Sequence, residues 1–309
     1  MGLLISQEEG AFEHVGAFYV TTCGAEFNVA IGMQRIGHPV GYYTKLGDDP
    51  FGKRIVNTMQ AEKISTELID FSQDRFTGFM LKSKVSQGDP AIFYFRRNSA
   101  ASTMSPEDVE RLDLSRYGAI HMTGITPAIS ESARAAAEAL CAKAKAEGMQ
   151  FSFDPNLRPQ LWPDRQVMID YMNTMAGKSD IFLPGINEAR ILVGTDVPEE
   201  IAQFYLNRGC GVVVVKLGTR GAYYATAQGE AGYVDGFPAK VVDTVGAGDG
   251  FAAGVLTGRL EGLSWEESVR RGNAVGAIQV MSLGDNDGLP TRRELLDFMA
   301  GKPDWRIQK

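Results

Sequence analysis

The feature that most constrains the fold of this chain is the alternation of strand-like and helix-like segments in its C-terminal two-thirds. The β-branched run at 212–218 (VVVVKLG) is typical of a strand buried in a parallel sheet. The run at 130–148 begins with a serine and ends with a glycine, as helices often do. This βαβα order predicts an α/β fold in which helices cover both faces of a parallel sheet.

The same patterns place the other elements along the chain. Strands are expected at 40–47, 117–122, 149–154, 179–184 and 212–218. Helices are expected at 23–37, 130–148, 163–177, 198–211, 248–261 and 264–283. No repeat or linker-like boundary divides the chain, so we expect a single domain over 1–309.

The first third of the chain departs from this alternation. Two strand-like segments, 76–85 and 91–97, are separated only by the turn-like SQGDP at 86–90 and have no helix between them. They predict a β-hairpin that leaves the α/β body. We expect a lid built from strands within about 12–22 and 76–97.

Composition narrows the possible partners and the cellular setting. A hydrophobic fraction of 44% over 309 residues suits a globular protein with a large core. The net charge of −7 and the lack of a basic run argue against binding to nucleic acid or an anionic membrane. The sequence shows no membrane-length apolar stretch and no secretory signal. Its three scattered cysteines are expected as free thiols in the cytoplasm.

The segment VVDTVGAGDGF at 241–251 is the clearest candidate for chemistry. Its small residues, Gly246, Ala247 and Gly248, precede a predicted helix, so backbone N–H groups there can approach an anion such as a phosphate. Asp249 at the helix start has two interpretations. It is either a helix N-cap or a base that accepts a proton from an attacking hydroxyl.

Three further segments carry candidate ligands, each beside a plainer interpretation. Gly218 and Gly221 after the 212–218 strand indicate either a ligand-binding turn or a simple tight turn. Tyr94 and Arg96 share one face of a strand and can hold a hydroxyl and a carboxylate, unless the hairpin only exposes solvated arginines. Arg158 follows another strand, where α/β ligands bind, unless it pairs with an acid such as Asp164.

The combination of these segments resembles the ribokinase-like (PfkB) sugar kinases. DTVGAGDGFAAG is similar to that family's C-terminal signature, and GAEFNVAIGMQRIG with KLGDDPFG to its N-terminal one. The resemblance implies a three-layer α/β/α body with a β lid, often dimeric through the lids. FYFRRNSAAS, FDPNLRPQLW, LPGINEARIL and GDNDGLPT resemble the members that phosphorylate the C6 hydroxyl of 2-keto-3-deoxygluconate with ATP and Mg²⁺.

The family's functional residues carry over position by position. The resemblance implies that Asp249 is the catalytic base, with the anion hole at Gly246, Ala247 and Gly248. Sugar-binding positions correspond to Gly24, Asn28, Tyr94, Arg96 and Arg158. Nucleotide-binding positions correspond to Lys216, Gly218, Thr219, Gly221 and Asn273. Glu188 corresponds to a glutamate that helps to organise Mg²⁺ and phosphate, and Asp243 with the Val245 carbonyl to a K⁺-type monovalent-cation site of some relatives.

Departures from the family pattern leave alternatives open. Gly185 stands where many relatives have an asparagine, and Cys23 and Met80 replace residues beside the sugar. Relatives also begin with a strand and a Gly-Glu pair ahead of the segment matching MGLLISQEEG. Either Met1 is an internal methionine of a longer chain, or a core strand is missing, and we expect the chain as given to be less stable than one with that strand.

The two arginines favour an acidic sugar as the substrate. Arg96 and Arg158 facing a neutral sugar would bury unpaired positive charge. A fructokinase, another sugar-acid kinase and a catalytically silent sugar-binding relative remain alternatives.

Overall fold

The body of the molecule is built on a six-stranded sheet, seen in a computed structural model that describes residues 1–85 and 90–306. Most of the turn predicted at 86–90 therefore lies outside the described residues. The strand order is β12-β11-β10-β9-β8-β7, parallel from β7 to β10 and antiparallel from β10 to β12. The strands are β7 (Ala119–Thr123), β8 (Gln150–Asp154), β9 (Ile181–Phe182), β10 (Val212–Lys216), β11 (Ala222–Thr226) and β12 (Ala231–Val234).

Alternating side chains on β10 define the three layers. Val213 and Val215 pack into a cluster with helices on one face, and Val212 and Val214 pack into a second cluster on the other face. The first face is covered by α4 (Glu131–Ala146), α5 (Arg165–Lys178), α6 (Ile186–Val193) and α7 (Pro198–Leu206). The second is covered by α1 (Ala25–Ile36), α8 (Ala247–Leu260) and α9 (Trp265–Gln279). The predicted α/β/α layering is confirmed.

Helices α8 and α9 pack closely through small residues. A Cβ atom added to Gly254 of α8 would lie 2.7 Å from the Cα atom of Gly272 of α9. This close approach requires glycine and fixes α8, whose first turn carries Asp249. The body is completed by α2 (Pro50–Ala61), α3 (Pro106–Glu110) and α10 (Arg292–Met299). In the part of the chain that the structure describes, no helix combines the length and apolarity needed to cross a bilayer.

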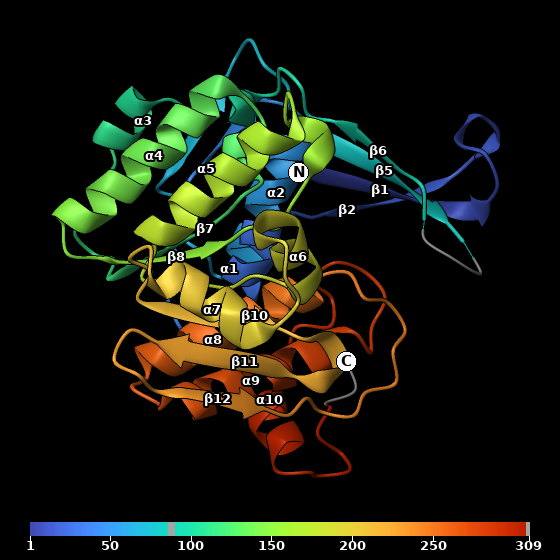
Figure 1. Cartoon of the computed structure of the whole chain (residues 1–309). Helices are drawn as coiled ribbons and strands as arrows, with labels where there is room; N and C mark the ends of the chain where they lie inside the picture. The colour runs from blue at the N-terminus through green and yellow to red at the C-terminus, as the bar shows by residue number, and fades with distance from the viewer. Residues whose placement is uncertain (86–89, 307–309) are drawn as a thin grey trace.

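The lid is a four-stranded sheet that projects from one side of the body (Figure 1). Its order is β2-β1-β5-β6, with β1 (Gly2–Glu9), β2 (Phe18–Thr22), β5 (Phe79–Lys84) and β6 (Ile92–Phe95). The antiparallel hairpin of β5 and β6 was predicted. The prediction missed β1, which pairs with both β2 and β5, and it began the first lid segment too early, since 12–14 form a 3₁₀ turn.

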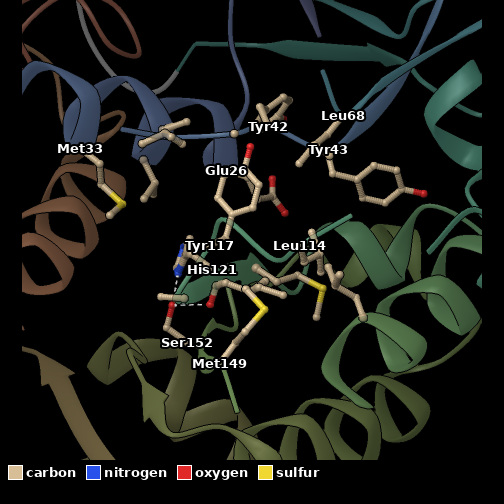
Figure 2. Close-up of a pocket in the computed structure, with 18 of the residues that line it drawn as sticks. Glu26, Met33, Tyr42, Tyr43, Leu68, Leu114, Tyr117, His121, Met149 and Ser152 are labelled. Atoms are coloured by element: carbon tan, nitrogen blue, oxygen red, sulfur yellow. Dashed lines mark hydrogen bonds between the residues drawn. The ribbon is translucent and has the colours of Figure 1, made fainter. Parts of the chain in front are cut away.

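A small parallel sheet of β3 (Thr44–Gly47) and β4 (Ile69–Ser72) lies apart from the six-stranded sheet. Between β7 and the segment leading into β3 is an apolar cavity of about 310 Å³, which we call the inter-sheet slot. Figure 2 shows Tyr42, Tyr43, Tyr117 and His121 around it. In the described residues, β7 pairs only with β8 and β3 only with β4, so each has one unpaired edge.

Two buried polar atoms of the slot are left without partners. Among the described residues, neither Nε2 of His121 nor the Tyr43 hydroxyl has a hydrogen-bond partner. Burial lowers the pKa of His121 to about 4, so the imidazole is neutral, and its Nδ1 lies 2.9 Å from the Ser152 hydroxyl. Open strand edges and orphaned polar atoms together show that this slot is incompletely packed.

We expect an additional apolar strand joined ahead of Met1 to fill the slot and raise the melting temperature by several degrees. Met1 lines a second cavity that shares Glu26, Tyr42 and Thr126 with the slot, so a strand attached there can reach it. Pairing the open edges and filling apolar volume both stabilise the folded state. The matched control is a glycine-serine extension of equal length. If the protein with the apolar extension melts no higher than the protein with the glycine-serine extension, the expectation is contradicted.

Candidate active site

A cavity of about 530 Å³ lies between the lid and the carboxyl ends of the parallel strands, where ligands of α/β proteins bind. The fold brings most of the predicted site residues to its wall. They are Gly24, Asn28, Tyr94, Arg96, Arg158, Glu188, Lys216, Val245, Gly246, Gly248 and Asp249. The predicted residues outside its lining are Ala247, Asp243, Gly218, Thr219, Gly221 and Asn273.

Asp249 lies in the first turn of α8 and is only 8% exposed. The N-cap of α8 is Gly246, and no side chain caps this helix, so the interpretation of Asp249 as a mere N-cap is wrong. Its Oδ2 instead accepts a hydrogen bond of 2.7 Å from Nδ2 of Asn28. Burial raises the pKa of Asp249 to about 7, although the bond from Asn28 opposes this shift. A carboxyl group with that pKa is suited to accept a proton near neutrality.

The turn ahead of Asp249 leaves room for an anion. Gly246 has a φ of 78°, and a Cβ atom there would lie 2.1 Å from the Asp285 carbonyl oxygen, so only glycine fits. The N–H groups in the first turn of a helix have no intrahelical acceptors. Those of Gly248 and Asp249 therefore remain available at the cavity, with the positive end of the α8 dipole behind them.

The pKa of Asp249 predicts how activity depends on pH. Because a base must be deprotonated, kcat/KM should fall about tenfold per pH unit below pH about 7 and level off above it. Since the Asn28 hydrogen bond lowers this pKa, an Asn28→Ala variant should show the same profile displaced to higher pH. Initial rates across the pH range test this. If the midpoint of the pH profile is the same in Asn28→Ala as in the wild type, the titration belongs to another group, such as the nucleotide.

Arg96, which follows β6, is buried at the cavity with its charge unmatched. It is 6% exposed, its Nε and Nη2 have no partner among the described residues, and its guanidinium lies 4.0 Å from the centre of the Tyr94 ring. Burial lowers the pKa of Arg96, and the charge of Arg158 adds to the effect. The interpretation of a hairpin with solvated arginines is therefore wrong for Arg96, although its neighbour Arg97 is exposed.

Arg158 approaches the same cavity from the loop after β8. Its Nη1 donates to the carbonyls of Leu157 at 2.8 Å and Asn156 at 3.4 Å, which fixes the guanidinium against its own loop. Asp164 accepts the N–H of Val167 as the N-cap of α5, and no ion pair joins it to Arg158 among the described residues. The predicted alternative of an Arg158–Asp164 pair is therefore wrong.

Lys216 at the end of β10 belongs to a largely buried cluster of charges with Glu188 and Asp154, of which Asp154 was not predicted from the sequence. Its Nζ lies 2.5 Å from Oδ2 of Asp154. Burial disfavours its charge, but Asp154 and Glu188 outweigh this and raise the pKa of Lys216. Glu188 accepts the N–H groups of Leu157 and Gly185, both at 2.8 Å, so its carboxylate orients two loops. An aspartate ending a parallel strand was the available signal for Asp154.

The predicted nucleotide turn and adenine position lie away from this cavity lining. Gly218–Arg220 forms a 3₁₀ turn directly after β10, which carries Lys216. Asn273 on α9 donates its amide to the carbonyls of Val234 and Asp235, at 3.0 and 3.1 Å. Asn273 therefore anchors the end of β12, and the roles of the turn and of Asn273 towards a nucleotide stay predictions.

The two groups predicted to hold a monovalent cation already have nitrogen partners. Oδ2 of Asp243 accepts from Nζ of Lys82 at 3.2 Å, and the Val245 carbonyl accepts from Nε2 of Gln279 at 3.2 Å. Oδ1 of Asp243 accepts the N–H of Val245 at 3.1 Å. As they stand, these groups do not fit a bound cation.

The departures in the sequence fall at the cavity wall. Cys23 and Met80 are buried beside Leu3 in the core of the lid and line the cavity. Burial raises the pKa of the Cys23 thiol to about 12, so this cysteine is an apolar wall group. Gly185, where many relatives have asparagine, does not displace Glu188, because the Glu188 carboxylate accepts the backbone N–H of Gly185.

Comparison with known proteins places this geometry in context. The family model described as pfkB family carbohydrate kinase matches residues 4–292. The chain is 43% identical over 304 residues to a 2-dehydro-3-deoxygluconokinase of Bacillus subtilis (strain 168), covering 98% of this chain and 94% of that protein. A crystal structure of a PfkB protein from Polaromonas sp. JS666 matches with a TM-score of 0.88 and 42% identity, over 96% of each chain.

A further solved structure shows a nucleotide on this fold. An E. coli protein crystallised in complex with ATP and Mg²⁺ matches with a TM-score of 0.87 and 26% identity. The match covers 97% of this chain and 96% of that one.

Proposed function

The chain belongs to the pfkB family of carbohydrate kinases, and we propose that it transfers the γ-phosphoryl group of ATP to the C6 hydroxyl of 2-keto-3-deoxygluconate. The observation that carries this choice of substrate is the buried guanidinium of Arg96, which lacks an acceptor for two of its nitrogens. Arg158 lines the same cavity. A carboxylate held by both arginines would satisfy charge that a neutral sugar leaves unpaired.

Asp249 supplies the base in this proposal. Its carboxylate accepts the proton of the C6 hydroxyl as that oxygen bonds to the γ-phosphorus, and ADP leaves with the electrons of the broken P–O bond. Asn28 holds Oδ2 of Asp249 through the 2.7 Å hydrogen bond and leaves Oδ1 for the substrate. The free N–H groups behind Gly246 stabilise the negative charge on the transferred group.

The residues at the cavity fit a nucleotide whose Mg²⁺ is held mainly by phosphate and water. Both oxygens of Glu188 already accept backbone N–H groups, so Glu188 would reach the ion through water. Bound Mg²⁺ would neutralise charge on the phosphates during transfer. Lys216, 3.6 Å from the position of a Cβ atom on Gly248, places positive charge beside the anion-binding turn. We therefore propose ATP as the phosphoryl donor, bound with Mg²⁺.

A coupled assay of ADP release tests the proposal. Purified protein is supplied with ATP, Mg²⁺ and, in separate reactions, 2-keto-3-deoxygluconate, other keto-deoxy sugar acids and fructose. We expect the highest kcat/KM with 2-keto-3-deoxygluconate. A higher value with fructose would favour the fructokinase alternative, and no ADP release with any sugar would favour a silent sugar-binding protein.

We also propose that two copies associate through their lids, because the outer lid face is apolar. Phe93 and Phe95 of β6, whose side chains lie on the face opposite Tyr94 and the cavity, are 58% and 44% exposed. Light scattering of the wild-type protein and a Phe93→Ser variant tests this association, with a monomeric wild type counting against it.

We also propose a cytoplasmic setting for this protein. Its three cysteines, Cys23, Cys141 and Cys210, are free and buried, which is compatible with that setting.

A further inference from the structure

A lysine from the lid lies buried beneath the anion-binding turn of Gly246–Gly248. Lys82 on β5 is 7% exposed, and its Nζ lies 3.2 Å from Oδ2 of Asp243 and 4.0 Å from Oδ1 of Asp285. The side chain of Asp285 is also 7% exposed, and its Oδ1 accepts no hydrogen bond among the described residues. Lys82 is thus the positive charge shared by the partly buried carboxylate of Asp243 and the buried carboxylate of Asp285.

An amide group occupies the other side of this turn. Gln279 on α9 is fully buried, and its Nε2 donates to the carbonyls of Val245 at 3.2 Å and Gly284 at 2.9 Å. A Cβ atom on Gly246 would lie 3.1 Å from the same nitrogen. One amide therefore joins the turn before Asp249 to the loop that contains Asp285.

The two side chains satisfy the oxygens that a monovalent cation would coordinate. A cation here would need the Asp243 carboxylate and main-chain carbonyls such as that of Val245 as oxygen ligands. Those oxygens face an ammonium and an amide instead. An ammonium also supplies the single positive charge that K⁺ would bring.

We propose that Lys82 and Gln279 together replace a monovalent cation beneath the anion-binding turn, so that catalysis by this chain does not require K⁺. Lys82 is then a positioning residue, because it acts on the turn through Asp243 and touches no reacting atom. The inference rests on the proposed kinase function for its kinetic test.

The position of Lys82 on the lid gives this replacement a second consequence. A diffusible cation would bind the turn without a contact from the lid, whereas the ammonium of Lys82 is carried by the lid strand β5. Lys82 and Asp243, the closer of the two charge pairs, are 161 residues apart in the sequence. Ordering of the turn and seating of the lid are therefore coupled through one ion pair.

The first experiment compares the wild-type protein in KCl and in tetramethylammonium chloride of equal ionic strength. We expect equal kcat and KM for the sugar acid and an equal melting temperature in the two salts. A wild-type protein that K⁺ activates, or whose melting temperature K⁺ specifically raises, would overturn the proposal. If no sugar is phosphorylated in either salt, the proposed function fails, while the melting temperatures still test the cation inference.

The second experiment removes the ammonium while keeping a side chain of similar length. In tetramethylammonium chloride, Lys82→Met should lower kcat by up to about a hundredfold, the loss that misplaced reacting groups cause. K⁺ should then restore part of kcat and raise the melting temperature of this variant. The matched control is Lys84→Met on the same strand, because this exposed lysine donates to the Gln7 carbonyl, away from the anion-binding turn, and its loss should leave kcat unchanged.

The outcomes of the variant separate a positioning role from a purely structural one. A structural defect lowers kcat and stability in every salt, and K⁺ does not rescue it. A folded Lys82→Met protein with unchanged kcat in tetramethylammonium would contradict the proposal. If Lys82→Met does not fold, a Gln279→Leu variant removes the amide on the other side of the turn. We expect the kcat of this variant to be raised by K⁺.

Discussion

Replacing Asp249 with asparagine is expected to lower kcat by about 10²–10⁴-fold, the range that general bases contribute. Asparagine keeps the shape of the side chain, and its carbonyl oxygen can still accept the hydrogen bond from Asn28. It has no basic oxygen to take the hydroxyl proton. ATP binding should persist, because the N–H groups of the turn are unchanged. Single-turnover rates and nucleotide titrations measure the two effects separately.

The stability of the same variant provides an independent check. The folded pKa of Asp249 is raised from 3.8 to about 7 by burial, so its favourable contribution is complete below pH 3.8 and lost as the pH rises through about 7. In mildly alkaline buffer the asparagine variant should therefore melt at the same or a higher temperature than the wild type. Asp235→Asn, at an exposed position, is the control. Near-wild-type kcat in the Asp249 variant would exclude its role as the base.

Loss of either cavity arginine is expected to lower kcat/KM for 2-keto-3-deoxygluconate by about tenfold to a hundredfold. A hydrogen bond to a charged group contributes about 1.5–3 kcal/mol, and Arg96→Ala or Arg158→Ala removes at least one such bond. Weak turnover of fructose should change little, because fructose has no carboxylate to lose. The measurement is kcat/KM of both variants with both sugars.

Arg97 offers a matched control for this pair. It lies next to Arg96 on the same segment but is exposed, so Arg97→Ala should leave both substrates unaffected. Equal losses on the acid and on fructose would assign Arg96 and Arg158 a structural role. No loss on either substrate would remove the reason for proposing an acidic sugar.

The elements with the strongest periodicity were the ones that could be predicted. The predicted α4 and β10 match the structure closely, because the helix has clear capping signals and the strand is a run of valines. The helix predicted at 198–211 ends at Leu206, since Gly209 with a φ of 100° interrupts it. The antiparallel pair β11 and β12 went unpredicted, although Gly229 marks a turn between them.

The candidate site was predictable where its residues share one segment. The turn and Asp249 stand together in the sequence, so their spacing indicated an anion site and a base. The Lys216–Asp154 and Lys82–Asp243 pairs join residues 62 and 161 positions apart, and no local pattern reports such contacts. The order of strands in the six-stranded sheet brings Lys216 to Asp154, and the packing of the lid on the body brings Lys82 to Asp243.

The inter-sheet slot has a mechanical consequence for the protein. An apolar cavity of about 310 Å³ makes the folded molecule larger than its atoms require, and unfolding eliminates that void volume. Hydrostatic pressure therefore favours states in which the slot collapses or opens to solvent. Among the described residues, side chains such as Tyr117 and no strand pairing connect the two sheets on either side of the slot. We therefore expect pressure to act first on this seam.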